Sequence, residues 1–177
     1  MTPRPAVFLD RDGVLVETLV RDGRPHAPLL LEDFRLIEGV GKEMARLRGS
    51  GFTCIVATNQ PELARGKLDP KILHQMHELL RSVTAVDDIY VCPHDPADGC
   101  ACHKPNPGLL LAAVERYSID LPRSFLVGDR WRDIEAGRAV GCYTILIDRP
   151  YSACRSAEAR VSTLAAAVDV ILRNSVG

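Results

Sequence analysis

Short apolar runs alternate along the chain with longer segments in which apolar residues recur at helical spacing. The short runs are predicted to be buried strands and span Ala6–Leu9, 52–57, 88–91, 124–127 and Tyr143–Ile147. Helices are predicted from Val40 to the glycines at 49 and 51, from Pro70 through Val83, from Pro107 through Val114, and over 134–140 and 163–172. Strands that alternate with helices predict an α/β fold, a Rossmann-like doubly wound parallel sheet with helices on both faces.

The segment 14–33, which follows the first predicted strand, shows no strong periodicity. Ligands of doubly wound sheets bind at the carboxyl ends of the strands, so we expect this segment to form a flap over such a site. A further short strand of the flap is expected at 34–37. Little other sequence separates Gly13 from the second predicted strand, and a large inserted cap domain is therefore not expected.

The composition is that of a soluble globular protein. The 177 residues suffice for one domain with a sizeable core, and we expect 1–177 to be a single domain. Hydrophobic residues make up 46% and charged residues 25%, with a formal net charge of −1. No basic run indicates a nucleic-acid partner, and no apolar stretch has the length of a membrane span or a signal peptide. We expect a monomeric cytoplasmic protein without nucleic-acid or membrane partners.

Two carboxylates, Asp10 and Asp12, follow the first predicted strand and precede Gly13. Taken alone, this pattern is as compatible with a solvated turn as with a functional site. Other polar groups also follow predicted strands, and these shift the balance toward a functional site: Thr58, Asn59 and Gln60 after the second, Lys104 after the third, and Gly128-Asp129 with Asp133 after the fourth. Each group is expected at the same edge of the sheet.

These motifs, in this order and over nearly the whole chain, resemble those of the haloacid dehalogenase superfamily of phosphohydrolases. The resemblance implies that Asp10 is the nucleophile, which forms an aspartyl-phosphate, and that Asp12 protonates the leaving alcohol and then deprotonates water. It implies that Thr58 binds the phosphoryl group and Lys104 neutralises it. It also implies a catalytic Mg²⁺ held by Asp10, Asp129 and the backbone carbonyl of Asp12, in keeping with the preference of Mg²⁺ for a few oxygen ligands.

Several residues near these motifs have less certain assignments. Asp133 is expected to reach the metal through water, to orient Lys104 or to cap its own helix, and the sequence leaves these roles open. Candidate substrate-binding residues are Arg11, Asn59, Gln60, Arg65, His103 and Arg130. For Arg65 and Arg130, a role as ordinary surface arginines is an equally good account. Cys54 is expected to pack in the core, and no role is assigned to Cys142 or Cys154.

A cluster of cysteines immediately precedes Lys104. Cys92, His94, Cys100 and Cys102 supply three thiolates and one imidazole, a complete tetrahedral set for structural Zn²⁺ with no open position. A disulfide or unrelated buried thiols are the alternatives. We expect zinc to hold the loop 92–104 in place beside the phosphate site.

The zinc pattern resembles a subgroup that includes D-glycero-D-manno-heptose 1,7-bisphosphate 7-phosphatases and histidinol-phosphate phosphatases. The short span between the ligand pairs is more similar to the histidinol-phosphate type, and the segments 58–60, 64–66 and 104–108 to the heptose type. The chain departs from the heptose pattern at Val16, at Pro61-Glu62 and at His103, where arginine is usual. These departures concern the substrate and leave the chemistry intact.

The leading prediction is therefore a Mg²⁺-dependent phosphomonoesterase for a small phosphorylated metabolite, a heptose bisphosphate above others. Histidinol phosphate is the alternative substrate. A zinc-stabilised binding protein without catalysis is the alternative from another class, and the intact set Asp10, Asp12, Thr58, Lys104 and Asp129 counts against it.

Overall fold

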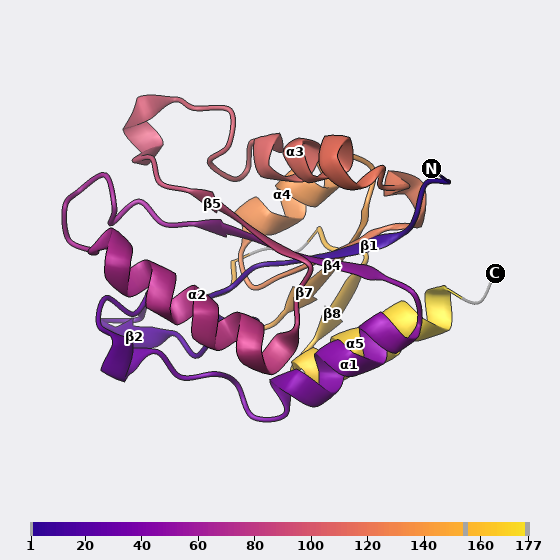
Figure 1. Ribbon diagram of the computed structural model, residues 1–177, viewed down its shortest axis with the longest axis horizontal. Coiled ribbons are helices and arrows are strands. Elements are labelled where there is room, and N and C mark those ends of the chain that lie inside the picture. Colours follow the sequence, from indigo (N-terminus) through magenta and orange to yellow (C-terminus); the bar gives the residue numbers. More distant parts are fainter. Residues whose placement is uncertain (1, 154–155, 176–177) are drawn as a thin grey trace.

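A parallel sheet forms the centre of the molecule in the computed structural model, which describes residues 2–153 and 156–175 (Figure 1). Within these residues its strand order is β5-β4-β1-β6-β7-β8. The bounds are β1 Ala6–Leu9, β4 Thr53–Asn59, β5 Asp88–Cys92, β6 Phe125–Gly128, β7 Tyr143–Ile147 and β8 Ala159–Val161. The chain runs outward from β1 through β4 and β5, returns, and runs the other way from β6. This order confirms the doubly wound fold and places its switch point between β1 and β6.

Helices cover both faces of the sheet (Figure 1). One face carries α1 (Val40–Gly49), α2 (Pro70–Thr84) and α5 (Leu164–Asn174), and the other carries α3 (Gly108–Tyr117) and α4 (Trp131–Ala139). Alternate residues of β1 enter different cores: Val7 packs in the cluster with Met44 of α1, and Phe8 in the cluster with Leu110 of α3. Burial on both faces explains why the strand sequences are continuously apolar.

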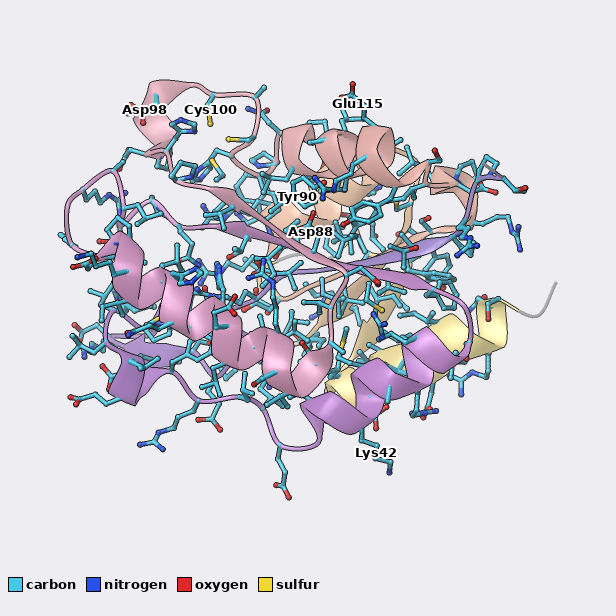
Figure 2. The ribbon with its side chains drawn as sticks, viewed as in Figure 1. Lys42, Asp88, Tyr90, Asp98, Cys100 and Glu115 are labelled. Carbon is cyan, nitrogen blue, oxygen red and sulfur yellow. The ribbon has the colours of Figure 1, made fainter. Side chains whose placement is uncertain are left out.

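Polar side chains occupy the outer faces of these helices. Figure 2 shows Lys42 on α1 and Glu115 on α3 pointing away from the sheet, and both are exposed. In α2 the exposed face also includes Leu79 and Val83, at 41% and 45% exposure, whereas His77 is buried. In α2, therefore, some apolar side chains are exposed and one polar side chain is buried. None of the helices in the described residues combines the length and apolarity that crossing a membrane requires.

The segment 14–33 contains a short antiparallel hairpin of β2 (Leu19–Arg21) and β3 (Arg24–His26), followed by the 3₁₀ turn η1 (Leu31–Asp33). Asp22 and Gly23 form its turn with positive φ angles of 50° and 71°, the conformation that suits a two-residue hairpin. The strand predicted at 34–37 is wrong. Leu36 forms only an isolated bridge with Val16, and Phe34 is buried in the core.

The remaining differences from the sequence prediction are an additional strand, short turns in loops and shifted ends of elements. Strand β8 was not predicted because three residues are too few to show a pattern. Helix α5 begins at Leu164, one residue later than predicted, since Thr163 is the N-cap and its hydroxyl accepts from the backbone N–H of Ala166. Two further 3₁₀ turns, η2 (Pro96–Asp98) and η3 (Leu121–Arg123), lie in loops. Cys154 lies outside the described residues.

Helix α2 has a side-chain cap at its N-terminus, Asp69. The exposed carboxylate of Asp69 accepts a hydrogen bond from the backbone N–H of Lys71 at 2.7 Å. Asp69→Ala should lower the free energy of unfolding by about 1 kcal/mol, because that N–H then loses its side-chain partner. Urea denaturation measures the change. Asp69→Asn keeps an acceptor oxygen and should stay close to the wild type; equal losses in both variants would contradict the capping role.

Candidate active site

Three carboxylates meet at the switch point of the sheet. Asp10 follows β1, and its backbone N–H donates to the carbonyl of Val127 at 2.9 Å, which extends the pairing with β6. Asp129 follows β6, and Asp133 lies in the first turn of α4. Oxygens of the three side chains lie within 4.8 Å of one another. The close approach needs a glycine at 128, since a Cβ there would lie 2.1 Å from the Cβ of Asp133.

Lys104 joins two of these carboxylates. Its Nζ donates to Asp10 Oδ1 at 2.9 Å and to the carbonyl of Ala57 at 2.6 Å, and lies 2.6 Å from Asp133 Oδ1. Burial alone would lower the pKa of Lys104, but Asp10 and Asp133 outweigh it and raise the pKa above its usual value. Asp133 also accepts from the backbone N–H of Arg130 and so caps α4. Two of the roles considered for Asp133, orienting the lysine and capping, are therefore visible together as contacts.

The two carboxylate oxygens of Asp129 differ in their hydrogen bonds. Its Oδ2 accepts from the hydroxyl of Tyr151 at 2.7 Å, whereas its buried Oδ1 has no hydrogen-bond partner among the described residues. Burial, then Asp10 and Asp133, raise the pKa of Asp129 to about 8. Lys104, together with Arg130 at 3.8 Å from Asp129 Oδ1, faces three carboxylates here, so negative charge is in excess. An unpaired buried oxygen within this excess fits a divalent cation that prefers oxygen ligands, as Mg²⁺ does.

Arg11 and Gln60 hold the carboxylate of Asp12. Arg11 donates to it twice, from Nε at 3.0 Å and from Nη2 at 2.8 Å, and Gln60 Nε2 donates at 2.8 Å. The Arg11 side chain is fully buried, stacks on Phe34 and contacts His77 Nε2 at 3.3 Å. Burial and the charge of Arg11 lower the pKa of His77 to about 3, so its neutral ring can accept from the guanidinium. The guanidinium of Arg11, a candidate substrate-binding residue, therefore faces the interior.

The other polar residues at the end of β4 also orient their neighbours. Gln60 is fully buried, and its Nε2 donates to Thr58 Oγ1 at 2.9 Å as well as to Asp12. Asn59 exchanges two hydrogen bonds with the backbone of Lys104, at 3.0 and 3.1 Å. These contacts fasten the end of β4 to the end of the loop 92–104.

A cavity of about 850 Å³ opens above these groups, and its lining includes Asp10, Asp12 and Lys104. Basic side chains from several segments also line it: Arg21, Arg24, His26, Arg65, Lys67, Arg130 and Arg132. Of these, Arg21, Arg24 and Arg132 have no ion-pair partner in the part of the chain that is described. The mouth of the cavity therefore carries positive charge that the protein leaves free.

Two arginines predicted to contact substrate lie at this cavity in different states. Arg65 is paired with Asp95 at 2.6 Å and with Glu62 at 2.5 Å, so its charge is already balanced. Arg130 stacks over Tyr151 at 5.9 Å, with its Nε 3.8 Å from Asp129 Oδ1. Of the two, Arg130 is the one whose guanidinium lies next to the carboxylate cluster.

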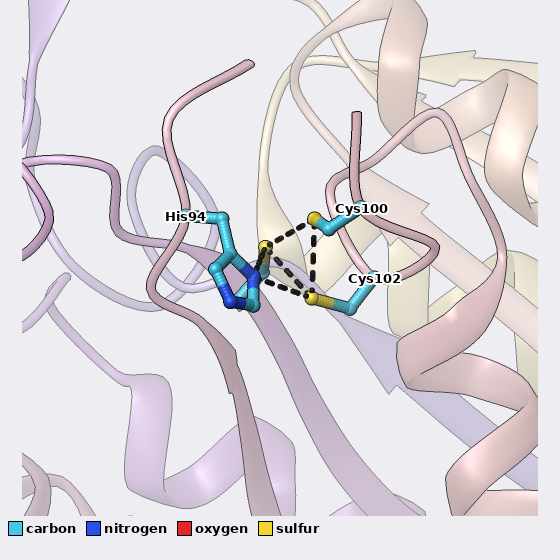
Figure 3. A group of neighbouring side chains, drawn as sticks. His94, Cys100 and Cys102 are labelled. Atoms are coloured by element: carbon cyan, nitrogen blue, oxygen red, sulfur yellow. Dashed lines mark hydrogen bonds between the residues drawn. The ribbon is translucent and has the colours of Figure 1, made fainter. Parts of the chain in front are cut away.

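The cysteine cluster is assembled around a common centre (Figure 3). The Sγ atoms of Cys92, Cys100 and Cys102 are 3.0 to 3.6 Å apart, and His94 Nδ1 lies 3.3 Å from Cys102 Sγ. Bonded sulfurs would be about 2.05 Å apart, so these thiols are not disulfides. Sulfurs at 2.3 Å from a tetrahedral Zn²⁺ would be about 3.8 Å apart, so a small outward shift of the thiols would admit the ion. The four residues fit a metal ion of this kind.

His103 lines the cavity and has one ring nitrogen without a hydrogen bond. Only 8% of the residue is exposed, and its Nδ1 lies 3.2 Å from the backbone carbonyl of His94. Its buried Nε2 has no hydrogen-bond partner among the residues described, although the residue lines the cavity. The loop 92–104 thus brings a histidine with an unpaired ring nitrogen to the wall of the cavity.

Known proteins share both the sequence and the fold. A family model described as HAD-hydrolase-like matches residues 101–167. A D-glycero-D-manno-heptose-1,7-bisphosphate 7-phosphatase from Thermosynechococcus vestitus is 39% identical, over 82% of this chain and 79% of its own. One from Pseudomonas aeruginosa is 41% identical, over 81% of each chain. The chain belongs to the heptose-bisphosphate 7-phosphatase family of haloacid dehalogenase-like hydrolases.

A solved member of this phosphatase family has the same architecture. The D,D-heptose 1,7-bisphosphate phosphatase of Bordetella bronchiseptica, crystallised with magnesium and phosphate, superposes with a TM-score of 0.82 at 31% identity. The match covers 96% of this chain and 98% of that one. The predicted superfamily and fold are confirmed, and of the two subgroups resembled, the relatives above carry the heptose name.

The sequence analysis of this phosphatase missed Tyr151, which contacts Asp129. A signal was available, because the polar run 148–152 follows β7 directly and so falls at the same edge of the sheet as the other motifs. A tyrosine in a loop has many possible partners, however, and only the folded chain shows that this one faces Asp129.

The crowded carboxylates should make the metal-free protein less stable than an uncharged variant. The pKa of Asp129 is about 8 in the folded protein against an ordinary value of 3.8, so its ionisation costs stability as pH rises between these values. In magnesium-free buffer, Asp129→Asn should match the wild type near pH 4 and melt several degrees higher at pH 8.

Thermal denaturation across this pH range measures the difference. Added Mg²⁺ should raise the melting temperature of the wild type and leave that of Asp129→Asn unchanged, since the variant lacks the ligand. A variant that melts below the wild type at pH 8 without magnesium would refute the charge argument.

Proposed function

We propose that the protein removes the 7-phosphate of D-glycero-D-manno-heptose 1,7-bisphosphate through an aspartyl-phosphate on Asp10. The observation that carries this proposal is the placement of Asp10 at the switch point, 2.9 Å from a charged Lys104 and beside the unpaired oxygen of Asp129. Membership of a family whose curated relatives are named for this activity supports the substrate.

The first step is attack by a carboxylate oxygen of Asp10 on the phosphorus. The bond from phosphorus to the sugar oxygen breaks, and Asp12 protonates that oxygen as it leaves. Asp12 then takes a proton from a water molecule, which attacks the aspartyl-phosphate, releases inorganic phosphate and regenerates Asp10. Arg11 and Gln60 fix the orientation of Asp12 for both transfers.

Positive charge must offset the repulsion between a carboxylate and a phosphoryl group. Lys104 supplies one charge and holds Asp10 by Oδ1. Asp10, Asp129 and the backbone carbonyl of Asp12 would hold Mg²⁺, which would supply further positive charge. Thr58, at the end of β4, offers its hydroxyl to the phosphoryl oxygens, and Gln60 orients its Oγ1 by a hydrogen bond.

The cavity mouth suits a substrate with a second anionic group. Arg21 and Arg24 come from the hairpin and Arg132 from α4, and these unpaired charges border one cavity. We expect the hairpin segment 14–33 to act as the flap over the bound sugar. His103 replaces the usual arginine with a ring nitrogen that can bond a sugar hydroxyl. Asn59 and Arg65 serve to fasten the surrounding loops.

We propose that the cysteine cluster holds a structural Zn²⁺. All four ligand positions are filled by protein atoms, so this ion has no open position for substrate. Its effect on catalysis is indirect, because the loop that it orders ends at Lys104. The other cluster, Asp10, Asp129 and Asp133, offers carboxylate oxygens, which suit Mg²⁺. The difference in ligand type therefore directs each metal to its own site.

Replacing the nucleophile tests the reaction. Asp10→Asn should lower kcat on heptose bisphosphate and on p-nitrophenyl phosphate by about 10³-fold or more, because an amide does not form the phosphoenzyme. Phosphate release with Mg²⁺ measures it. Asp169→Asn, a matched change on the exposed surface of α5, should retain full activity.

Side-by-side rates on heptose bisphosphate and histidinol phosphate test the substrate. A preference for histidinol phosphate would overturn the proposed substrate and keep the chemistry. If metal-replete wild-type protein hydrolyses no phosphate ester, the proposed enzymatic activity fails and the alternative of a non-catalytic binding protein takes its place.

Metal analysis tests the cysteine cluster. The purified wild type should contain about one zinc per chain, and the double change Cys100→Ser with Cys102→Ser should remove it and lower the melting temperature. Cys142→Ala, a buried cysteine outside the cluster, should keep the zinc. A full zinc content in the double variant would show that the metal binds elsewhere.

A further inference from the structure

The segment that follows β7 touches both loops that carry the carboxylates. Arg149 donates to the carbonyl of Gly13 from Nε at 3.2 Å and from Nη2 at 2.9 Å. Ser152 donates from its hydroxyl to the backbone carbonyl of Asp129 at 2.5 Å. Tyr151 donates to the Asp129 side chain at 2.7 Å. This segment lies outside the catalytic motifs, yet two of its side chains, those of Tyr151 and Ser152, contact the proposed metal ligand Asp129.

The hydroxyl of Tyr151 distinguishes the two oxygens of Asp129. It holds Oδ2, and Gly13 packs so closely on that oxygen that a Cβ at position 13 would lie 2.1 Å from it and 2.9 Å from the tyrosine oxygen. The other oxygen, Oδ1, accepts no hydrogen bond among the described residues and lies 3.8 Å from Arg130 Nε. The terminal torsion of an aspartate is otherwise broad, so this contact decides which oxygen is held and which stays without a hydrogen bond.

Thr18 completes a chain of hydroxyls that leads to the hairpin. Its Oγ1 lies 2.8 Å from the tyrosine oxygen. Because the Tyr151 proton is directed at Asp129, the tyrosine oxygen accepts the proton of Thr18. Thr18 directly precedes β2. The segment over the cavity is thereby joined to Asp129 through two consecutive hydrogen bonds.

We propose that Tyr151 is a positioning residue that presents Oδ1 of Asp129 to the Mg²⁺ ion, and that Thr18 connects this arrangement to the hairpin. The inference rests on the proposed function, in which Asp129 is a metal ligand. Residues that orient metal ligands by hydrogen bonds typically contribute 10- to 100-fold to metal affinity. Tyr151 acts on the metal site through Asp129 alone, with no role in the transfer of the phosphoryl group.

The test is Mg²⁺ binding by calorimetric titration of the zinc-containing protein. Tyr151→Phe removes only the hydroxyl and should weaken Mg²⁺ binding about 10- to 100-fold. Thr18→Val should weaken it less, in the same direction. Tyr143→Phe is the matched control, since its ring packs against Phe125 away from the cluster, and its affinity should not change. At saturating Mg²⁺, kcat of Tyr151→Phe should return to within a few-fold of the wild type.

The outcomes separate this inference from the proposed function. Wild-type affinity in a folded Tyr151→Phe protein overturns the positioning role, and so does a loss of kcat that saturating Mg²⁺ does not restore. If Tyr151→Phe does not fold, Thr18→Val decides, because unchanged Mg²⁺ affinity in that variant overturns the hydroxyl chain. If the wild type itself binds no Mg²⁺, or Asp129→Asn binds it equally well, the proposed metal site fails and the inference fails with it.

Discussion

The structure depends on the excess of negative charge where β1 and β6 meet. Two like charges no more than 4.8 Å apart repel by at least about 3 kcal/mol at an effective dielectric constant of about 20. The fold concentrates three carboxylates in such a space and sets against them Lys104 and, at a longer distance, Arg130. Repulsion between these carboxylates destabilises the folded protein when no cation is bound, and a bound cation removes that repulsion. That cost is what makes the carboxylates useful to phosphoryl chemistry.

Residues from distant segments keep the charged groups in place. The position of Lys104 is set by Asn59 from β4 on one side and by the cysteine loop on the other. Asp12 is set by Arg11, whose guanidinium is in turn fixed by a buried histidine of α2. The reacting groups therefore sit on loops at strand ends, while their orientation comes from the packed body of the protein. This arrangement combines an open cavity with a rigid floor.

The sequence was sufficient for the fold and for the central set of carboxylates, because both follow from local patterns. Apolar runs locate strands, and polar residues after parallel strands must share an edge. The direction of Arg11 was not predictable, since its neighbours Phe34 and His77 are far away along the chain. The hairpin had a local signal in Asp22-Gly23, but three-residue strands with little alternation conceal it.

The hairpin is a two-stranded sheet of its own, separate from the central sheet, and Val20 at its centre is 54% exposed. Its side chains border the cavity without being needed to fill the core. Substitutions there can accumulate with little effect on folding, whereas the floor of the cavity tolerates few. The residues at the mouth can therefore change while the reaction stays the same. Substitutions within the eight residues 19–26 are a route by which such a protein could acquire a new substrate.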